Sequence, residues 1–363
     1  MLDIFRVTLL ATCVSSLTHH FASTKKYIFG SRPSAGTLTR YLVAPTYELL
    51  NEGTMEIPFS CNTTNFRSLH LSSSSRNLGI WGTASTGICS VLFGITSDGY
   101  TTIRSKEIVG DIHSLAWSPS GRSLHALDSS SSASSTTSIT NFRITDTPNL
   151  EDVTGIDVLS NVSSASQIVS HPTGDWVYVV TRDTNELVTV SLQESAQLHR
   201  NATLTPSRHK LLPLSLDASQ FHTTSLAITA SRTSLWALSQ SSNQAVITAF
   251  GLNVTTGEVI GVAARASWKG AGEGLLTAAP FEAGDMVAIT NSPVGYVTIL
   301  GLDSSSLTVA NEPALGSEHD FLQPIAVTAA KRSGIEASSA KVKSYGRVIL
   351  EDFLNVGEGV WID

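Results

Sequence analysis

Histidine, charged and amide side chains recur where short apolar segments of this sequence begin or end. A histidine suits general acid–base chemistry because its unperturbed pKa lies near neutral pH, and an arginine suits the binding of a carboxylate. Candidates at predicted first-strand starts are His113, Ser166, His222 and Glu273, and those at predicted second-strand ends are Asp128, Arg182, Gln240 and Asn291. At a strand end, such a side chain either contacts a ligand or is simply solvated.

The elements that must position these side chains are pairs of apolar segments joined by a tight polar turn. The segments 114–127 and 167–180 each read as strand, turn and strand, with proline and glycine in the turn. Proline fixes φ and glycine permits positive φ, so together they favour a chain reversal. Weaker copies are Leu226 to Leu238, Thr277 to Thr290, Arg67 to Trp81 and Ile325 to Ser338.

Successive turns are separated by about fifty residues, the length of one four-stranded propeller blade. Six copies are visible, and a seventh is expected from the ends of the chain, with Lys26–Gly30, Thr37–Val43 and Gly359–Asp363 as its strands. The sequence thus predicts an all-β, seven-bladed β-propeller of four-stranded antiparallel blades, its ring closed by N- and C-terminal strands. Strand starts and second-strand ends would then meet at one channel mouth. His171, in a turn, would lie at the opposite end as a structural residue.

Composition narrows the functional classes. The formal net charge is −7 and the charged fraction 15%; without a basic stripe, a nucleic-acid partner is not expected. We find neither a G-x-S-x-G elbow nor a glycine-rich phosphate loop. His113, His222, Glu273 and Asp128 are of types that suit zinc or calcium, but no local ligand spacing supports a site. We predict no cofactor and no metal, and the sequence sets no oligomeric state.

The N-terminal 23 residues differ from the rest, because Arg6 precedes an apolar stretch from Val7 to Leu17. We interpret residues 1–23 as a signal peptide or N-terminal extension and 24–363 as one propeller domain. The stretch is too short and too polar for a membrane span. A signal peptide would make the protein secreted or cell-wall-bound, and a plain extension leaves it cytoplasmic.

Cysteines and glycosylation motifs fit secretion. With Cys13 removed, Cys61 and Cys89 are the only possible pair, as one disulfide or two buried thiols. On a secreted glycoprotein, the N-x-S/T sequons would lie on exposed loops; they begin at Asn62, Asn161, Asn201 and Asn253.

Four segments carry a resemblance to a known family: 112–119, 170–178, 286–296 and 360–363. They resemble the fungal 3-carboxy-cis,cis-muconate cyclases, which share a seven-bladed propeller with bacterial 6-phosphogluconolactonases. The similarity runs from about Tyr27 to Asp363, nearly the whole chain after the predicted signal.

The resemblance implies an intramolecular lyase or lactonase activity on a small carboxylated or lactone substrate. His113 matches the position of a proposed catalytic histidine of the cyclases, so it is our predicted catalytic residue. Other family positions are substituted: Ser166 replaces an arginine, Arg182 a glutamate and Gln240 another arginine, while His222 stands where an arginine is expected. Losing such anion contacts removes about 1.5–3 kcal/mol per charge-assisted hydrogen bond.

Two hypotheses follow. In the first, the protein is a divergent lactone-forming or lactone-hydrolysing enzyme, with His113 as acid or base and the substrate bound by Arg182, His222, Gln240, Glu273, Asn291, Ser166 and Asp128. In the second, it is a catalytically inactive secreted propeller that acts as a binding or cell-surface protein, such as an antigen.

Overall fold

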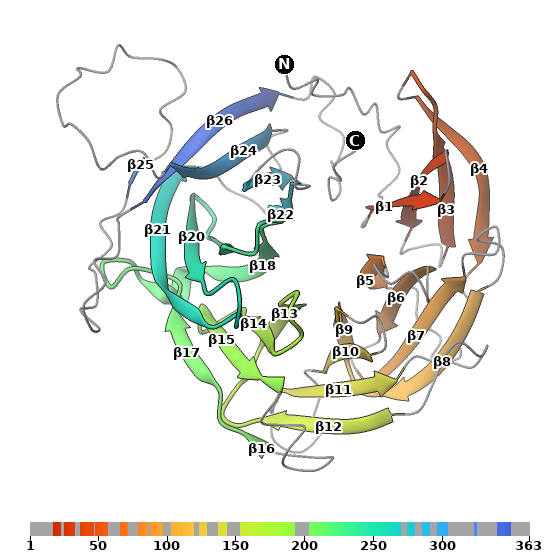
Figure 1. The fold of residues 1–363 in the computed structure, drawn as a ribbon, viewed down its shortest axis with the longest axis horizontal. Coiled ribbons are helices and arrows are strands. Elements are labelled where there is room, and N and C mark those ends of the chain that lie inside the picture. Colours follow the sequence, from red (N-terminus) through yellow and green to blue (C-terminus); the bar gives the residue numbers. More distant parts are fainter. Residues whose placement is uncertain are drawn as a thin grey trace. The chain divides into compact units, whose positions relative to one another are not determined.

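The computed structural model describes the backbone of residues 17–22, 25–32, 37–46, 48–56, 66–71, 79–85, 88–96, 103–119, 123–128, 137–143, 153–192, 203–269, 274–279, 285–290, 296–303, 323–324 and 340–349. The chain forms two compact units. The first comprises Met1–Ser163, Ser195–Leu204 and Leu354–Asp363, and the second Ser164–Glu194 and Thr205–Phe353. The described residues of each unit form three sheets (Figure 1).

The first unit is built from antiparallel sheets of consecutive strands. One sheet has the order β1 (Leu17–Ala22), β2 (Lys25–Arg32), β3 (Thr37–Val43) and β4 (Leu49–Glu56). The next is β5 (Phe66–Leu71), β6 (Gly79–Ser85), β7 (Cys89–Thr96) and β8 (Ile103–Val109). The third is β9 (Ile112–Trp117), β10 (Ser123–Asp128), β11 (Ser138–Arg143) and β12 (Val153–Leu159), with β16 (Thr203–Leu204) added in parallel to β12.

The second unit repeats this plan. Its first sheet is β13 (Ala165–Ser170), β14 (Trp176–Thr181), β15 (Glu186–Ser191) and β17 (Ser207–Lys210). Its second is β18 (His222–Ile228), β19 (Ser234–Gln240), β20 (Gln244–Leu252), β21 (Val259–Lys269) and the short β25 (Gln323–Pro324). Its third is β22 (Leu275–Ala278), β23 (Met286–Thr290), β24 (Tyr296–Asp303) and β26 (Lys341–Ile349). A 3₁₀ turn, Ala218–Gln220, precedes β18.

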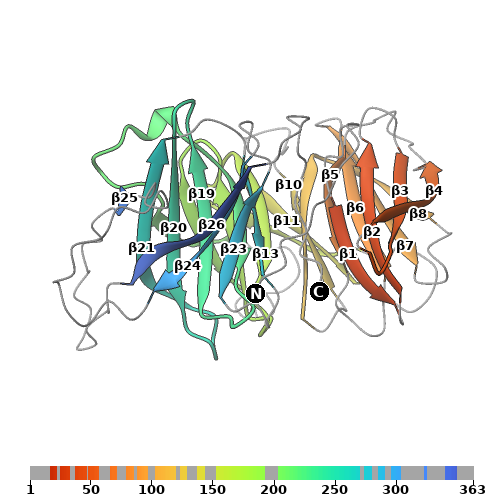
Figure 2. The ribbon, with the colours of Figure 1, turned by 90° about the horizontal axis from the view of Figure 1, so that it is seen from above.

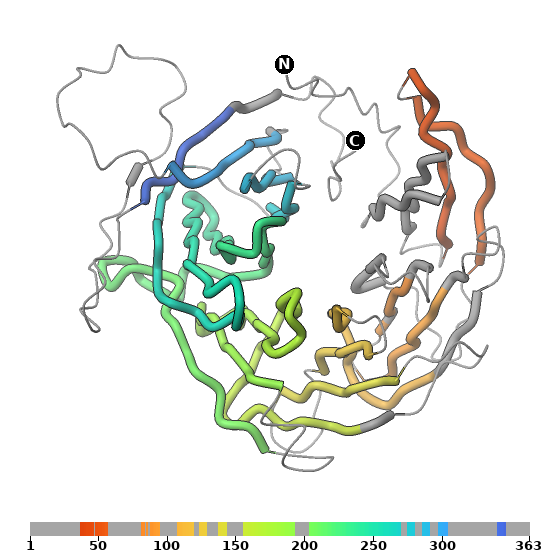
Figure 3. Tube along the Cα trace, viewed as in Figure 1, coloured from red at the N-terminus to blue at the C-terminus, as the bar shows by residue number. Residues whose placement is uncertain are grey.

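Within each unit, neighbouring sheets pack through apolar side chains. In the first, Leu92, Leu115 and Phe142 belong to one buried cluster, beside which the Trp81 and Trp117 rings meet edge to face at 5.5 Å. In the second, one cluster joins the β13 and β18 sheets, and another joins the β18 and β22 sheets. A sheet covered on both faces buries successive residues, which is why the middle strands are continuous apolar runs. Figure 2 shows β19, β20 and β21 side by side, and Figure 3 traces their hairpins.

The predicted hairpins are confirmed wherever the structure describes them. They are β5–β6, β9–β10, β13–β14, β18–β19 and β22–β23, whereas Ile325 to Ser338 lies outside the described residues. The Lys26–Gly30 and Thr37–Val43 segments fall in β2 and β3, which pair with β1 and β4 in a sheet of N-terminal strands. β1 includes residues of the predicted signal. The Gly359–Asp363 strand lies outside the described residues, so seven blades and ring closure stay predictions.

The cysteine and sequon expectations are tested in part. Cys89 is disulfide-bonded, and Cys61 lies outside the described residues. Asn161 and Asn253 are both exposed, as expected for their sequons, while Asn62 and Asn201 also lie outside the described residues. No helix in the described ranges is long and apolar enough to cross a membrane.

Candidate functional site

A β-bulge interrupts the first strand pair of several sheets near the start of the first strand. In the first unit, Ile112 pairs with Asp128 and Ser114 with Leu127, so His113 is the extra residue. The same skip in the register leaves Ser166 unpaired in β13 and Thr224 unpaired in β18. Arg67 holds the equivalent backbone position in β5. Bulges redirect side chains and are frequent beside active sites, and His113 is the histidine among the four residues at these equivalent positions.

His113 is half-buried and is oriented by a main-chain contact. Its Nδ1 lies 2.9 Å from the carbonyl oxygen of Asp111, two residues earlier. A carbonyl oxygen only accepts, so the neutral imidazole carries its proton on Nδ1. The lone pair is then on Nε2, the nitrogen that would accept a proton in general base catalysis. This geometry fits the predicted acid–base role.

The side chain of Asp128, for which substrate binding stays a prediction, supports the turn before β9. One carboxylate oxygen accepts the backbone N–H of Asp111 at 2.9 Å. Gly110 has φ +132°, and a Cβ at this position would overlap the Asp128 carboxylate. Ser85 donates to the Asp111 carboxylate at 2.5 Å. Asp128 and His113 therefore contact the same residue, Asp111, one at its N–H and the other at its carbonyl oxygen.

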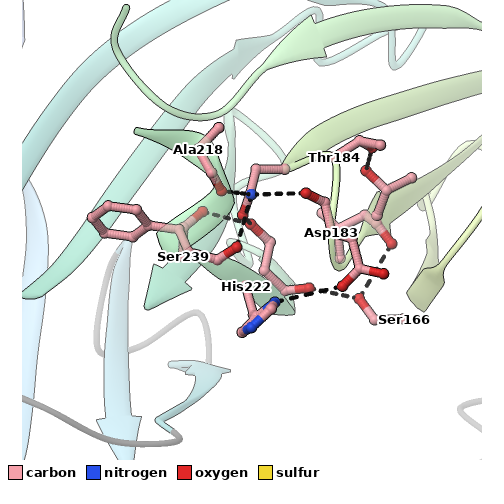
Figure 4. A network of polar contacts seen from close by, with 11 residues as sticks. Ser166, Asp183, Thr184, Ala218, His222 and Ser239 are labelled. Atoms are coloured by element: carbon pink, nitrogen blue, oxygen red, sulfur yellow. Dashed lines mark hydrogen bonds and ion pairs between the residues drawn. The ribbon is translucent and has the colours of Figure 1, made fainter. Parts of the chain in front are cut away.

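The second unit brings three predicted positions into one polar network (Figure 4). Ser166 donates its hydroxyl to the Thr223 carbonyl at 2.8 Å and lies 3.2 Å from the Val180 carbonyl. Arg182 donates its N–H to Ser164 at 2.6 Å and accepts the N–H of Thr223 at 3.1 Å. Its side chain is exposed. The Ser166 hydroxyl thus links the β13 sheet to the β18 sheet. Arg182 is held by its backbone hydrogen bonds, and its guanidinium group is exposed to solvent.

His222 forms a pair that the sequence analysis missed. Its Nδ1 lies 3.5 Å from an Asp183 carboxylate oxygen, and the two side chains are 52% and 59% exposed. An exposed pair of this kind contributes about 0–1 kcal/mol to stability. The sequence did offer one indication of this pair, because Asp183 directly follows Arg182, a predicted site residue at a second-strand end. The arrangement gives a proton-transfer group with a carboxylate partner, and Arg182 is the adjacent residue in the chain.

The loop Arg182–Thr184 rests on buried Asn185. The Asn185 amide donates to the Ala218 and Phe221 carbonyls at 3.0 and 2.9 Å, and its oxygen accepts the Thr223 hydroxyl at 2.8 Å. Asn185 is 1% exposed with φ +49°, a conformation that asparagine tolerates better than most residues. The buried side chain of Asn185 therefore anchors this exposed loop, and no sequence motif predicted this role.

The remaining predicted positions divide into structural residues and residues that are not described. Gln240 pairs with His222 in the β18–β19 register and accepts the Gly274 N–H at 2.8 Å, so it holds the start of the β22 sheet. Glu273 and Asn291 lie outside the described residues. His171 is fully buried in its turn, with Nδ1 2.9 Å from the Thr173 hydroxyl, which confirms its structural role.

Among the residues that the structure describes, no group of three or more histidine, cysteine, aspartate or glutamate side chains could hold a metal ion. His113 and Asp128 belong to the first unit and His222 to the second, while Glu273 is not described.

The sheets and their register define a β-propeller, and solved structures share this fold. The periplasmic gluconolactonase PpgL of Pseudomonas aeruginosa matches with a TM-score of 0.55 and 17% identity over 86% of this chain and 88% of that one. A candidate 6-phosphogluconolactonase from Bacteroides fragilis matches with a TM-score of 0.54 and 11% identity over 91% and 97%.

Hsv2 of Kluyveromyces lactis matches with a TM-score of 0.54 and 10% identity over 92% of this chain and 86% of that one. No protein-family profile matches the chain, and no curated protein matches it. At these sequence identities, the similarity establishes the propeller fold alone and assigns no function to this chain.

Proposed function

We propose that the protein is a lactonase-like enzyme that hydrolyses or forms a lactone, with His113 as its acid–base residue. One observation carries the proposal: His113 stands at a bulge at the start of β9, and the Asp111 carbonyl orients its ring through Nδ1 at 2.9 Å. This contact leaves Nε2 as the proton acceptor. The gluconolactonase that shares the fold supports the same class of reaction.

In the hydrolytic direction, Nε2 of His113 removes a proton from water as the oxygen attacks the lactone carbonyl. The tetrahedral intermediate then collapses, the ring C–O bond breaks, and the imidazolium returns the proton to the departing alkoxide. The product is a hydroxy acid, and lactone formation is the reverse. In a cyclase-type reaction, a substrate carboxylate would add across a conjugated double bond while His113 protonates the developing carbanion. General acid–base catalysis of this kind contributes about 10²–10⁴-fold to rate.

The sharpest test uses His113→Asn, because the Asn amide can still donate to the Asp111 carbonyl but offers no basic ring nitrogen. Turnover of a panel of lactones and muconates is followed by proton release or uptake. We expect wild-type turnover and a loss of about 10²–10⁴-fold in kcat for the variant. The control is Thr224→Ala, at the equivalent bulge of β18, which should retain wild-type rates. Undiminished turnover by His113→Asn would overturn the role of His113.

A second candidate, a propeller that binds without turnover, is favoured by a separate observation. The side chains of Ser166 and Gln240 bond backbone groups of the fold. Their polar atoms are therefore already engaged at positions where the cyclases resembled by this sequence carry arginines. If the wild type turns over none of the lactones and muconates above buffer, this candidate replaces the enzymatic one.

A further inference from the structure

The turn that precedes β9 is held by hydrogen bonds to nearly every polar group of its backbone. Ser90 donates its hydroxyl to the Gly110 carbonyl at 2.8 Å and accepts the Ile112 N–H at 2.7 Å. The Ile112 carbonyl accepts the Thr83 hydroxyl at 2.8 Å. The Asp111 N–H is bound to Asp128. Since His113 follows directly, the direction of the Asp111 carbonyl depends on this support.

An aspartate at position 128 is not required for the bulge itself. The same register position, opposite the residue before the bulge, is held by Thr181 in β14 and Ser239 in β19. In β6 it is held by Ala84. The same bulge forms beside each of them. The acceptor oxygen that Asp128 places on the Asp111 N–H therefore serves something other than the bulge, and the residue next to this turn is His113.

We propose that Asp128 is a positioning residue for His113. The carboxylate fixes the Asp111 N–H at 2.9 Å, and the Asp111 carbonyl in turn receives Nδ1 of His113 at 2.9 Å. Asp128 fixes the peptide group before Asp111, and Ser90 binds the Ile112 N–H of the peptide group that carries the Asp111 carbonyl. Together they hold this carbonyl towards the ring. Asp128 thereby helps to keep the neutral imidazole protonated on Nδ1, with Nε2 as the base.

The catalytic consequence rests on the proposed function, whereas the protonation pattern does not. Loss of Asp128 should lower kcat by about 10–100-fold, the range known for hydrogen-bond partners of metal-binding histidines, and leave KM nearly unchanged. Asp128→Asn keeps an acceptor oxygen at the same place and should preserve both kcat and the Nδ1 proton. Asp128→Ala removes the acceptor and should lose both.

The experiment measures ¹⁵N chemical shifts of the histidine rings in the full chain, at a pH where His113 is neutral. The His113 signals are identified by their absence in His113→Asn. Wild type and Asp128→Asn should show a protonated Nδ1 and a bare Nε2, and Asp128→Ala should show a mixture of both tautomers. The matched control is Thr181→Ala, at the equivalent position of β14, which should leave the His113 shifts unchanged.

The outcomes separate the two proposals. Unaltered His113 shifts in folded Asp128→Ala would overturn the positioning role, as would a change of the same size in Thr181→Ala. If Asp128→Ala does not fold, Asp128→Asn decides, because a change of tautomer there contradicts the model of a simple acceptor. Expected shifts together with an inactive wild type would leave the positioning intact and reject only the enzymatic function.

Discussion

Asn185 offers a stringent test of how the exposed loop at the end of β14 is held. Its amide donates to the Ala218 and Phe221 carbonyls, and its oxygen accepts the Thr223 hydroxyl. The side chain is 1% exposed, so water cannot replace these partners without opening the structure. Asn185→Ala removes all of these bonds at once. The Ala218 carbonyl keeps the Phe221 N–H and the Thr223 hydroxyl keeps Ser239, so the main buried group that loses its donor is the Phe221 carbonyl.

The expected loss can be worked from these contacts. Each of the three close hydrogen bonds contributes about 0.5–1.5 kcal/mol net, and a buried group left unsatisfied costs about 1–3 kcal/mol. The backbone at φ +49° adds about 1 kcal/mol when alanine replaces asparagine, because a Cβ without a local polar contact disfavours this region. The free energy of unfolding should therefore fall by about 3–5 kcal/mol.

The assay is urea unfolding at equilibrium, with the midpoint compared at constant m-value. Asn185→Gly separates the two contributions, because glycine tolerates positive φ but makes none of the side-chain bonds; it should be more stable than Asn185→Ala by about 1 kcal/mol. Asn243→Ala, an exposed asparagine in a turn, is the control and should change stability by less than about 0.5 kcal/mol. A loss below about 1 kcal/mol for Asn185→Ala would refute the reasoning.

Two further perturbations address stability. Asp285 accepts a backbone N–H and a hydroxyl from Ser231 and a second hydroxyl from Thr233, so Asp285→Ala should lower the unfolding free energy by about 1.5–3 kcal/mol, and an unchanged urea midpoint would contradict this. The pKa values of His125 and His171 are lowered, mainly by burial; the unfolded chain therefore takes up protons first, and stability should fall as the pH drops below about 6.5. Urea midpoints measured against pH check the sign, and a flat profile between about pH 7.5 and 5 would contradict it.

The hairpins could be predicted from sequence because their signals are local. A turn such as Pro172 to Gly174 and the β-branched run that follows it lie within a few residues of one another. The outer strands carry no such signal. β17 pairs with β15 and β25 pairs with β21, and in both cases residues that are not described separate the two strands in the sequence. Their partners are distant in sequence, so only packing selects them.

The site was predicted less well, for a physical reason. The bulge at His113 exists only in the register between β9 and β10, and neither strand alone encodes it. Whether Gln240 faces a ligand or the Gly274 N–H depends on where the next sheet begins. The Asp183 partner of His222 comes from another strand end. Sequence identified the strand ends, but the direction of each side chain follows from neighbours that are remote in the chain.

These contacts suggest how to separate ligand-binding from structural residues at the strand ends of a propeller. Ser166 and Gln240 bond the framework through their side chains, so a ligand would first have to break a bond worth about 1 kcal/mol. Arg182 bonds the framework through its backbone and leaves its side chain exposed. His113 combines the two properties, because a bond at Nδ1 orients the ring while the chemistry belongs to Nε2. A functional group held in this way is both oriented and reactive, which is why His113 is the residue on which the proposed activity depends.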